Sequence, residues 1–392
     1  MAGRLESKRD GKGYMTQRKV LFIFGTRPDA IKLAPVINKF HQYPEEFKTV
    51  VVVTAQHRQM LDQVLHLFNI HPDHDLNIMT HDQTLSQVTA RALEGLDRVI
   101  EQEKPDIIFV QGDTTTTFVG ALAAYYHRLP VAHVEAGLRT YNRYQPYPEE
   151  INRVLTSSLA DLHFAPTEQA KINLLKENIA SSKIFVTGNT VIDALLDVAI
   201  REYDFDETLD RVFLKRETRK ILLTTHRREN HGGPMTDICD ALLTILGKFK
   251  DVEIVFPVHM SPRVRDVVYP LLENNPRIHL VPPLDYQAFV NVMKQSYLIL
   301  SDSGGVQEEA PSLGKPVLVL RETTERPEAV AAGTVKLIGT DHDRIVHETE
   351  RLLTNEMSYK AMTSKANPYG DGLASERIVQ TVIRYFDSRV VI

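Results

Sequence analysis

Short apolar runs recur along the chain, each bounded by turn-forming residues. Most are rich in valine and isoleucine and do not alternate with polar residues, which is typical of strands buried on both faces of a parallel sheet. In the first half the runs are Val20–Phe24, Val50–Thr54, Ile107–Val110, Val131–Val134, Leu162–Phe164 and Ile184–Val186. In the second half they are Ile221–Thr224, Glu253–Phe256, Ile278–Val281, Leu298–Leu300, Val317–Leu320 and Val335–Ile338.

Helical periodicity lies between these runs. In the stretch "TLSQVTARALEGLDRVI" the apolar residues share one face, and Thr84 with Gln87 predicts a capping box at its start. A second apolar stripe predicts a helix over residues 61–68. Strands that alternate with helices favour doubly wound α/β units.

The alternation runs twice, with a seam near Gly188, and a length of 392 residues also favours two domains. We therefore expect an α/β fold of two Rossmann-like, doubly wound domains that face each other across a cleft. The first would hold residues 20–187 and a C-terminal helix over 376–392, and the second residues 188–375. Residues 1–19 are polar and basic without the apolar core of a signal peptide, so we expect a disordered leader.

Composition and charge argue against several classes of protein. The net charge is −5, and no basic field indicates nucleic-acid binding. No apolar run approaches the about 18 residues of a membrane span. Cys239 is the only cysteine, so no intrachain disulfide is possible, which fits a reducing compartment. We expect a cytoplasmic protein that binds neither nucleic acid nor membrane.

Polar side chains follow five of the predicted strands. In open α/β sheets ligands bind beyond the carboxyl ends of the strands, so these segments are candidates for a common site. The first strand is followed by Gly25, Thr26 and Arg27, with Lys32 about one turn further along. The other four strands are followed by "QGDTTTT", "EAGLR", "THRREN" and "SDSGGVQEE".

The first of these turns carries one glycine and an arginine, and it lacks the G-x-G-x-x-G fingerprint of a dinucleotide site. The "DSGG" segment is a better candidate for binding phosphate, because small residues before a helix let backbone N–H groups approach an anion. Its alternative role is a helix cap and a tight turn. Four cations, Arg27, His226, Arg227 and Arg326, favour a mono- or diphosphate ligand.

Three carboxylates are candidates for acid/base chemistry. Asp113 either caps a helix or acts as a functional carboxylate. Glu135 follows an apolar strand, where it is either functional or ion-paired with Arg139 or another neighbour. Glu149 and Glu150 stand at an expected helix start, where a structural role is predicted for one of them. Three carboxylates and a histidine beside cations suit acid/base chemistry on a phosphorylated substrate.

Metal and nucleophile chemistry find little support in the sequence. His71, His74 and His81 cluster around a proline without helical spacing, and we expect them in a solvated loop. No H-E-x-x-H segment, cysteine pair or G-x-S-x-G elbow is present. We expect neither a metal nor a cofactor.

Taken together, the motifs resemble those of the bacterial non-hydrolysing UDP-N-acetylglucosamine 2-epimerases from Val20 to the C-terminus. The resemblance implies a GT-B-like fold with an active site in the interdomain cleft. It also implies interconversion of UDP-GlcNAc and UDP-ManNAc through elimination of UDP, a homodimer, and service to a bacterial surface polysaccharide. The segments that carry it are "FGTRPDAIKLAP", "TAQHRQML", "GDTTTT", "HVEAGLRT", "PYPEEINR", "FVTGNTVIDAL", "HRREN", "FPVHMSP", "DSGGVQEEAPSLGKPVLVLR", "TERPEAV" and "NPYGDG".

The resemblance also implies roles for individual residues. The positions that match the family's catalytic carboxylates are Asp113, Glu135 and Glu149, and His226 matches the residue that supports the departing UDP. Substrate-binding positions are matched by Arg27, Lys32, Leu284, Phe289, Ser303, Gly304, Gly305, Glu309 and Arg326. A second UDP-GlcNAc, bound as an activator, would contact Gln56, Gln59, Arg227 and His259.

Two departures from the family pattern stand near these positions. Asp82 lies where some relatives carry arginine, which puts activation by a second UDP-GlcNAc in question. Tyr141 lies where glycine is frequent, in the loop that leads to Glu149. Three other interpretations remain open: a GT-B glycosyltransferase, a hydrolysing epimerase, and a non-catalytic UDP-sugar sensor. A sensor would not need all three carboxylates.

Overall fold

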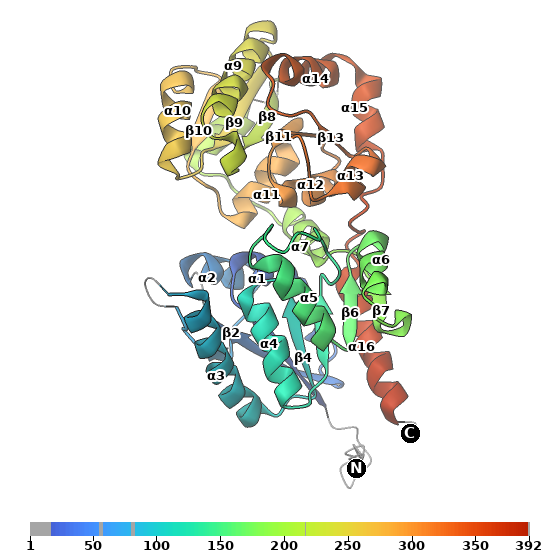
Figure 1. The fold of residues 1–392 in the computed structure, drawn as a ribbon. Coiled ribbons are helices and arrows are strands. Elements are labelled where there is room, and N and C mark those ends of the chain that lie inside the picture. Colours follow the sequence, from blue (N-terminus) through green and yellow to red (C-terminus); the bar gives the residue numbers. More distant parts are fainter. Residues whose placement is uncertain (1–16, 55–57, 80–82, 216, 391–392) are drawn as a thin grey trace. The chain divides into compact units, whose positions relative to one another are not determined.

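The computed structural model describes residues 17–54, 58–79, 83–215 and 217–390, shown as a ribbon in Figure 1. Contacts between Cα atoms group the chain into two compact units. The first holds the described residues up to Ala194 together with those from Gly370 onward, and the second holds Leu195–Tyr369. Each unit contains one parallel sheet with helices on its faces, so the predicted α/β fold of two Rossmann-like domains is confirmed.

In the first unit, the described residues form a seven-stranded parallel sheet of order β3-β2-β1-β4-β5-β6-β7. Its strands are β1 (Arg18–Phe24), β2 (Phe47–Val53), β3 (His74–Asp75), β4 (Ile107–Gln111), β5 (Val131–Val134), β6 (Leu162–Ala165) and β7 (Ile184–Val186). Its helices are α1 (Arg27–Phe40), α2 (Arg58–Leu67), α3 (Leu85–Glu103), α4 (Thr115–Tyr126), α5 (Glu149–Leu159), α6 (Glu168–Lys176), the first part of α7 (Thr190–Ala199) and α16 (Ala374–Val390), with a short 3₁₀ helix at Ser181–Lys183.

In the second unit, the described residues form a six-stranded parallel sheet of order β10-β9-β8-β11-β12-β13. Its strands are β8 (Arg219–Thr224), β9 (Val252–Pro257), β10 (Ile278–Val281), β11 (Leu298–Ser301), β12 (Val317–Val319) and β13 (Val335–Leu337). Its helices are α8 (Glu207–Phe213), α9 (Gly233–Lys248), α10 (Pro262–Leu272), α11 (Tyr286–Gln295), α12 (Gly304–Glu309), α13 (Pro327–Ala332), α14 (His342–Thr354) and α15 (Glu356–Thr363), with 3₁₀ helices at Arg228–Asn230 and Ala310–Leu313.

The strand orders decide which turns become neighbours. In the first unit β1 pairs with both β2 and β4, so the order reverses between β1 and β4. In the second unit β8 pairs with β9 and β11, and the order reverses between β8 and β11. Ligands of open α/β sheets bind at such switch points. A ligand is therefore expected at the turns that follow β1 and β4, and at those that follow β8 and β11.

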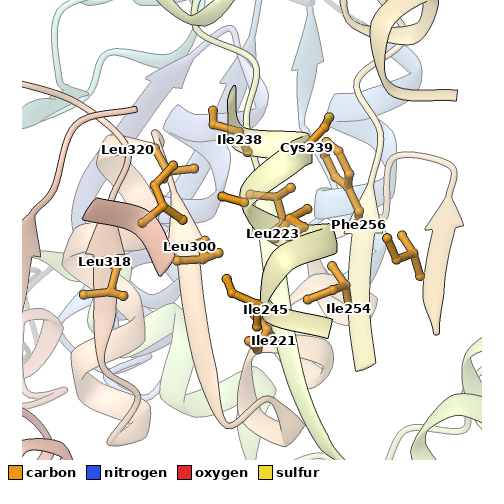
Figure 2. Close-up of a cluster of buried hydrophobic side chains, with 14 of the residues drawn as sticks. Ile221, Leu223, Ile238, Cys239, Ile245, Ile254, Phe256, Leu300, Leu318 and Leu320 are labelled. Carbon is orange, nitrogen blue, oxygen red and sulfur yellow. The ribbon is translucent and has the colours of Figure 1, made fainter. Parts of the chain in front are cut away.

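Figure 2 shows the core that fixes the sheet of the second unit. Leu223 of β8, Phe256 of β9 and Leu300 of β11 point to one face of the sheet and meet Ile238 and Ile245 of α9. All five side chains are fully buried. Burial of an aliphatic or aromatic side chain of this size contributes about 1.5–3 kcal/mol to the stability of the fold. The core therefore holds the strands, and the turns that follow them, in place.

The helices expected from periodicity are present. Thr84 caps α3, accepting a hydrogen bond from the Gln87 backbone N–H at 3.3 Å, and the Gln87 side chain accepts one from the Thr84 N–H at 2.9 Å. The capping box predicted from the sequence is thereby confirmed. The C-terminal helix α16 packs against α1 in the first unit, where Glu376 accepts a hydrogen bond from the Tyr43 hydroxyl at 3.1 Å.

The segment with three histidines differs from the expectation. His74 is not part of a solvated loop but begins the edge strand β3, and its Nε2 lies 2.9 Å from Glu103 Oε1. The prediction was wrong because pairing with β2 depends on tertiary contacts that a two-residue strand does not signal. His71 is exposed, and His81 lies outside the described residues. In the described part of the chain no group of three His, Cys, Asp or Glu side chains is placed to hold a metal ion. No helix of that same part is long and apolar enough to cross a membrane.

Two histidines stand side by side inside the sheet of the first unit. His133 of β5 and His163 of β6 are in register, and both are fully buried. Burial lowers the pKa of His133 to about 4 and that of His163 to about 3. The His133 Nε2 is 2.7 Å from the Gly112 carbonyl oxygen. Neither ring nitrogen of His163 makes a hydrogen bond of normal geometry to a described residue.

We expect acid to destabilise the fold through His163. Between pH 6.5 and about 3 the unfolded chain binds a proton at this site and the folded chain does not, so stability is lost as pH falls. From pH 7 to pH 5 the loss amounts to about 2 kcal/mol. Urea unfolding of wild type and His163→Leu at both pH values measures it as the difference between the two proteins.

Asp29 has the opposite effect, because burial raises its pKa to about 6 and its folded form binds a proton first as pH falls. That contribution is present in both proteins and cancels in the comparison. If the stability of wild type and of His163→Leu depended equally on pH, acid destabilisation could not be attributed to His163.

Candidate functional site

The turn after β1 is held tightly against its neighbours. Thr26 caps α1, and the Asp29 carboxylate accepts a hydrogen bond from the Thr26 backbone N–H at 3.2 Å, which completes a capping box. Gly25 lies beside the Thr54 and Thr116 hydroxyls, which are 2.9 Å apart. A Cβ atom built on Gly25 would collide with both, at 2.6 Å from the Thr116 oxygen. This glycine is required for close packing of the turn.

Gly25→Ala is expected to lower the free energy of unfolding by about 1–3 kcal/mol, since the added methyl group must separate two bonded hydroxyls. Urea unfolding measures the change. Gly247→Ala is the matched control, because a Cβ on Gly247 of α9 meets nothing within 4 Å. Alanine in that helix is expected to be stabilising by about 0.5–1 kcal/mol. Equal effects of the two substitutions would contradict this account of the turn.

Lys32 of α1 and Glu135, which follows β5, form a largely buried ion pair in the first unit. Lys32 Nζ lies 2.5 Å from Glu135 Oε1, and the Glu135 side chain is 5% exposed. The same carboxylate accepts hydrogen bonds from Gln111 Nε2 at 2.6 Å and from Asn189 Nδ2 at 2.9 Å. Glu135 is therefore ion-paired, as one alternative held, but its partner is Lys32. Arg139 donates instead to Glu177, with Nε 2.7 Å from Oε1.

Asp113 does not cap α4. Thr114 is the N-cap residue, and its hydroxyl accepts a hydrogen bond from the Thr117 N–H at 3.3 Å. The Asp113 carboxylate lies instead against the Arg153 guanidinium, with Nε and Nη2 at 2.8 and 2.6 Å from Oδ2. The side chain is 25% exposed. The capping alternative for Asp113 is therefore wrong, since the next residue, Thr114, is the cap.

The two glutamates at the start of α5 have different environments. Glu150 is buried and accepts hydrogen bonds from the backbone N–H groups of Thr140 at 3.1 Å and Tyr141 at 2.9 Å. It also pairs with Arg153 at 3.0 Å. Glu149 Oε2 is buried and has no hydrogen-bond partner among the described residues. A buried oxygen without a donor is costly, so Glu149 is the one of the pair that is available to a ligand.

Tyr141 occupies a left-handed backbone conformation with φ of 60°, which explains why glycine suits this position. Hydrogen bonds made by the tyrosine itself hold it in this conformation. Its hydroxyl donates to Asn173 Oδ1 at 2.9 Å, and its backbone N–H donates to Glu150. The departure from the family pattern therefore ties the loop before Glu149 to α6.

Asp29 is a buried carboxylate of this site that was not predicted from the sequence. It is 4% exposed, and burial raises its pKa to about 6 against the opposing hydrogen bond from Thr26. The charge of Asp113 contributes to the same rise. The available signal was the spacing of Thr26 and Asp29, which matches a capping box with Asp in place of Glu.

In the second unit, a buried carboxylate organises the turn after β8. Asp302 follows β11 and is fully buried. It accepts hydrogen bonds from the Thr225 hydroxyl at 2.7 Å and from the backbone N–H groups of His226 and Arg227, each at 2.9 Å. The side-chain amide of Asn230 adds another at 2.9 Å. The "HRREN" and "DSGG" segments thus form one structure around this carboxylate.

Two guanidinium groups stand at the start of α12. A Cβ on Gly304 would lie 3.8 Å from Arg227 Nη2 and 4.0 Å from Arg326 Nη2. Arg326 pairs with Glu308, and Arg227 lies 3.5 Å from Glu325. Ser303 is the N-cap residue, but its hydroxyl makes no capping bond within the described residues. Two cations beside the backbone N–H groups at the start of a helix form an arrangement that can bind phosphate.

The remaining predicted contacts of the second unit lie around α11 and α12. Glu309 is 6% exposed and accepts a hydrogen bond from the Tyr286 hydroxyl at 2.7 Å. Gly305 lies beside it, since a Cβ there would be 3.6 Å from Glu309 Oε2. Leu284 and Phe289 flank the start of α11, and both are half-buried rather than part of the core.

The residues expected to bind an activator are only partly described. Gln56 and Asp82 lie outside the described residues, and the side chain of Gln59 is likewise not described. His259 is exposed, and its ring stacks on that of His226 with centroids 6.0 Å apart. Arg227, expected at the activator, is placed in this unit beside Gly304.

A family model described as UDP-N-acetylglucosamine 2-epimerase matches residues 39–383. The chain belongs to the UDP-N-acetylglucosamine 2-epimerase family. The resemblance carried by the motifs is therefore confirmed at the level of the family. Relatives of this name span nearly the whole chain.

The UDP-N-acetylglucosamine 2-epimerase of Bacillus subtilis is 55% identical over 375 residues, covering 96% of this chain and 97% of its own. That of Escherichia coli K12 is 53% identical, covering 93% and 98%. The crystal structure of the enzyme from Neisseria meningitidis bound to UDP-GlcNAc is 49% identical, with a TM-score of 0.82, and covers 93% of this chain and all of that one.

Proposed function

We propose that this protein is an isomerase that interconverts UDP-GlcNAc and UDP-ManNAc by inverting carbon 2 of the sugar. The observation that carries the proposal is the identity of more than half of the residues, over nearly full length, to curated epimerases of this name. The carboxylates of the first unit and the cations beside Gly304 supply the residue types that this reaction requires.

The chemistry explains why carboxylates and an anion site are both needed. The proton on carbon 2 has no adjacent carbonyl group, so it is not acidic and its direct exchange is slow. We propose that UDP is eliminated to give 2-acetamidoglucal, with a double bond between carbons 1 and 2. The bond from carbon 1 to the diphosphate oxygen breaks, and its electron pair leaves with UDP. UDP adds back after a proton reaches the opposite face of carbon 2.

Each set of groups has a role in this scheme. Asp113, Glu135 and Glu149 would remove and deliver the carbon 2 proton. Arg27, Arg326 and the backbone N–H groups at Ser303–Gly305 would stabilise the charge on the departing diphosphate, with His226 in support. Lys32 holds Glu135 in place at 2.5 Å. Glu309 would bind the ribose hydroxyls, and Leu284 and Phe289 would flank the uracil.

We also propose the finer features that the family resemblance implies. These are the non-hydrolysing outcome, a second UDP-GlcNAc that activates the enzyme, a homodimer, a cytoplasmic location, and supply of ManNAc for a surface polysaccharide. Activation would involve Gln56, Gln59, Arg227 and His259. Asp82, in place of an arginine found in some relatives, is a reason to expect weaker activation here.

Proton NMR of UDP-GlcNAc with the purified protein in deuterated water tests the proposal, without added nicotinamide or metal. We expect UDP-ManNAc to appear, with deuterium at carbon 2 of both sugars. Free ManNAc with stoichiometric UDP would identify a hydrolysing epimerase. An unchanged sugar, together with measurable UDP binding, would contradict the proposal and favour a glycosyltransferase that lacks its acceptor or a UDP-sugar sensor.

A further inference from the structure

The strongest remaining feature is the carboxylate of Asp302, because it lies directly behind His226. Its Oδ1 is 3.3 Å from His226 Nδ1, while the exposed fraction of the Asp302 side chain is 0%. Among the described residues no hydrogen-bond partner is found for the opposite ring nitrogen, Nε2. The histidine therefore has one nitrogen directed at a buried anion and the other available.

The two oxygens of Asp302 are used unequally. Oδ2 accepts hydrogen bonds from the Thr225 hydroxyl, the backbone N–H groups of His226 and Arg227, and the Asn230 amide, at 2.7–2.9 Å. Within the described part of the chain, Oδ1 faces only His226, through its backbone N–H at 3.2 Å and its ring at 3.3 Å. A carboxylate only accepts hydrogen bonds and repels a nitrogen lone pair, so the hydrogen is favoured on the ring nitrogen that faces it at 3.3 Å.

We propose that Asp302 is a positioning residue that fixes His226 in the tautomer protonated on Nδ1 and leaves Nε2 to take up and return a proton beside the diphosphate. The turn that contains His226 is folded around the same carboxylate, so ring orientation and tautomer are set together. The catalytic purpose of this arrangement rests on the function proposed above. The tautomer itself does not depend on that function.

The surroundings of the ring lower the pKa of His226 in the absence of a bound anion. Burial lowers the pKa of His226, and the neighbouring Arg227 and His259 act in the same direction against Asp302. A bound diphosphate adds negative charge, which favours the protonated ring. The added proton would then occupy Nε2, because Nδ1 already carries one, and Asp302 would stabilise the resulting cation.

Asp302→Asn is the informative substitution. An amide has one accepting oxygen and one donating nitrogen. Since Oδ2 receives four hydrogen bonds, the amide oxygen is expected there, and its NH₂ group would then face His226 Nδ1. That nitrogen must become an acceptor, so the ring is expected to change to the Nε2-protonated tautomer.

Nitrogen-15 NMR of histidine-labelled full-length protein above pH 8 reads the tautomer directly, with the His226 signals assigned by their loss in His226→Gln. We expect Nδ1–H in wild type and Nε2–H in Asp302→Asn. Thr225→Val is the matched control, because it removes one hydrogen bond to the same carboxylate without touching the imidazole. It should keep the wild-type tautomer.

For turnover, we expect Asp302→Asn to lower kcat for epimerisation about 10- to 100-fold, as is usual for residues that orient a functional histidine, with a smaller change in KM. An Nε2-protonated ring in the wild-type protein would overturn the inference, whether or not Asp302→Asn folds. Unchanged kcat and tautomer in a folded Asp302→Asn would also overturn it. Absence of epimerisation by wild type would contradict the proposed function alone, since the tautomer is measured without substrate.

Discussion

Glu149→Gln is expected to reduce turnover of UDP-GlcNAc about 10²- to 10⁴-fold, the usual contribution of a positioned acid or base. Affinity for UDP should change little, because the Glu149 carboxylate has a buried oxygen that none of the described residues satisfies. Asp113→Asn and Glu135→Gln are expected to behave alike. Initial rates by proton NMR and UDP affinity by calorimetry measure the two quantities.

Glu150→Gln is the matched control for Glu149→Gln, since the two residues are adjacent at the start of α5. Glu150 holds the loop at Thr140 and Tyr141 and pairs with Arg153, so its loss should appear as a lower melting temperature. Loss of UDP affinity in parallel with turnover in Glu149→Gln would show that Glu149 has a structural role and would contradict its assignment.

Arg153→Met is expected to lower the free energy of unfolding by about 3–5 kcal/mol, the usual cost of leaving a buried charge unpaired. Arg153 lies between Asp113 and Glu150, with side chains 25% and 4% exposed. Its loss leaves both carboxylates without this cation, and turnover should fall as well because Asp113 is no longer held. Urea unfolding at pH 7 measures the stability.

Arg153→Lys separates charge from geometry. Lysine retains the positive charge but lacks the guanidinium that reaches Asp113 with two nitrogens and Glu150 with a third. We expect it to recover much of the stability and less of the turnover. A folded Arg153→Met of wild-type stability and activity would show that solvent already compensates the two carboxylates.

For the carboxylates of the first unit, the sequence predicted the positions but not the partners. Each was identified from its position after a strand or at a helix start, and these positions are local properties of the chain. Their partners lie far away in sequence: Lys32 is 103 residues from Glu135, and Arg153 is 40 residues from Asp113. For that reason the partners of these carboxylates, Lys32 for Glu135 and Arg153 for Asp113, were not predicted. The capping alternative for Asp113 was wrong for a local reason, because Thr114 is the cap.

In the second unit, the contacts of Asp302 likewise join residues that are far apart in the sequence. From the sequence, the "DSGG" segment is a candidate phosphate site or helix cap, and no local pattern indicates a separate role for its first residue, Asp302. In the structure Asp302 organises a turn 72–77 residues earlier, because β8 and β11 are neighbours in the sheet. A residue that follows one strand can thus shape the turn that follows another, and no local pattern reports it.

The sequence by itself determined the described strands other than β3, the helices near residues 61–68 and 84–100 and at the C-terminus, the capping box of α3, the α/β class and the family, because periodicity, caps and ordered motifs are properties of short segments. Only the tertiary structure decided which carboxylates are paired, that Glu150 rather than Glu149 holds the loop, that His74 belongs to a strand, and that Asp302 lies behind His226. These facts depend on strand order and burial, which bring distant residues together at distances that residue spacing along the chain does not encode.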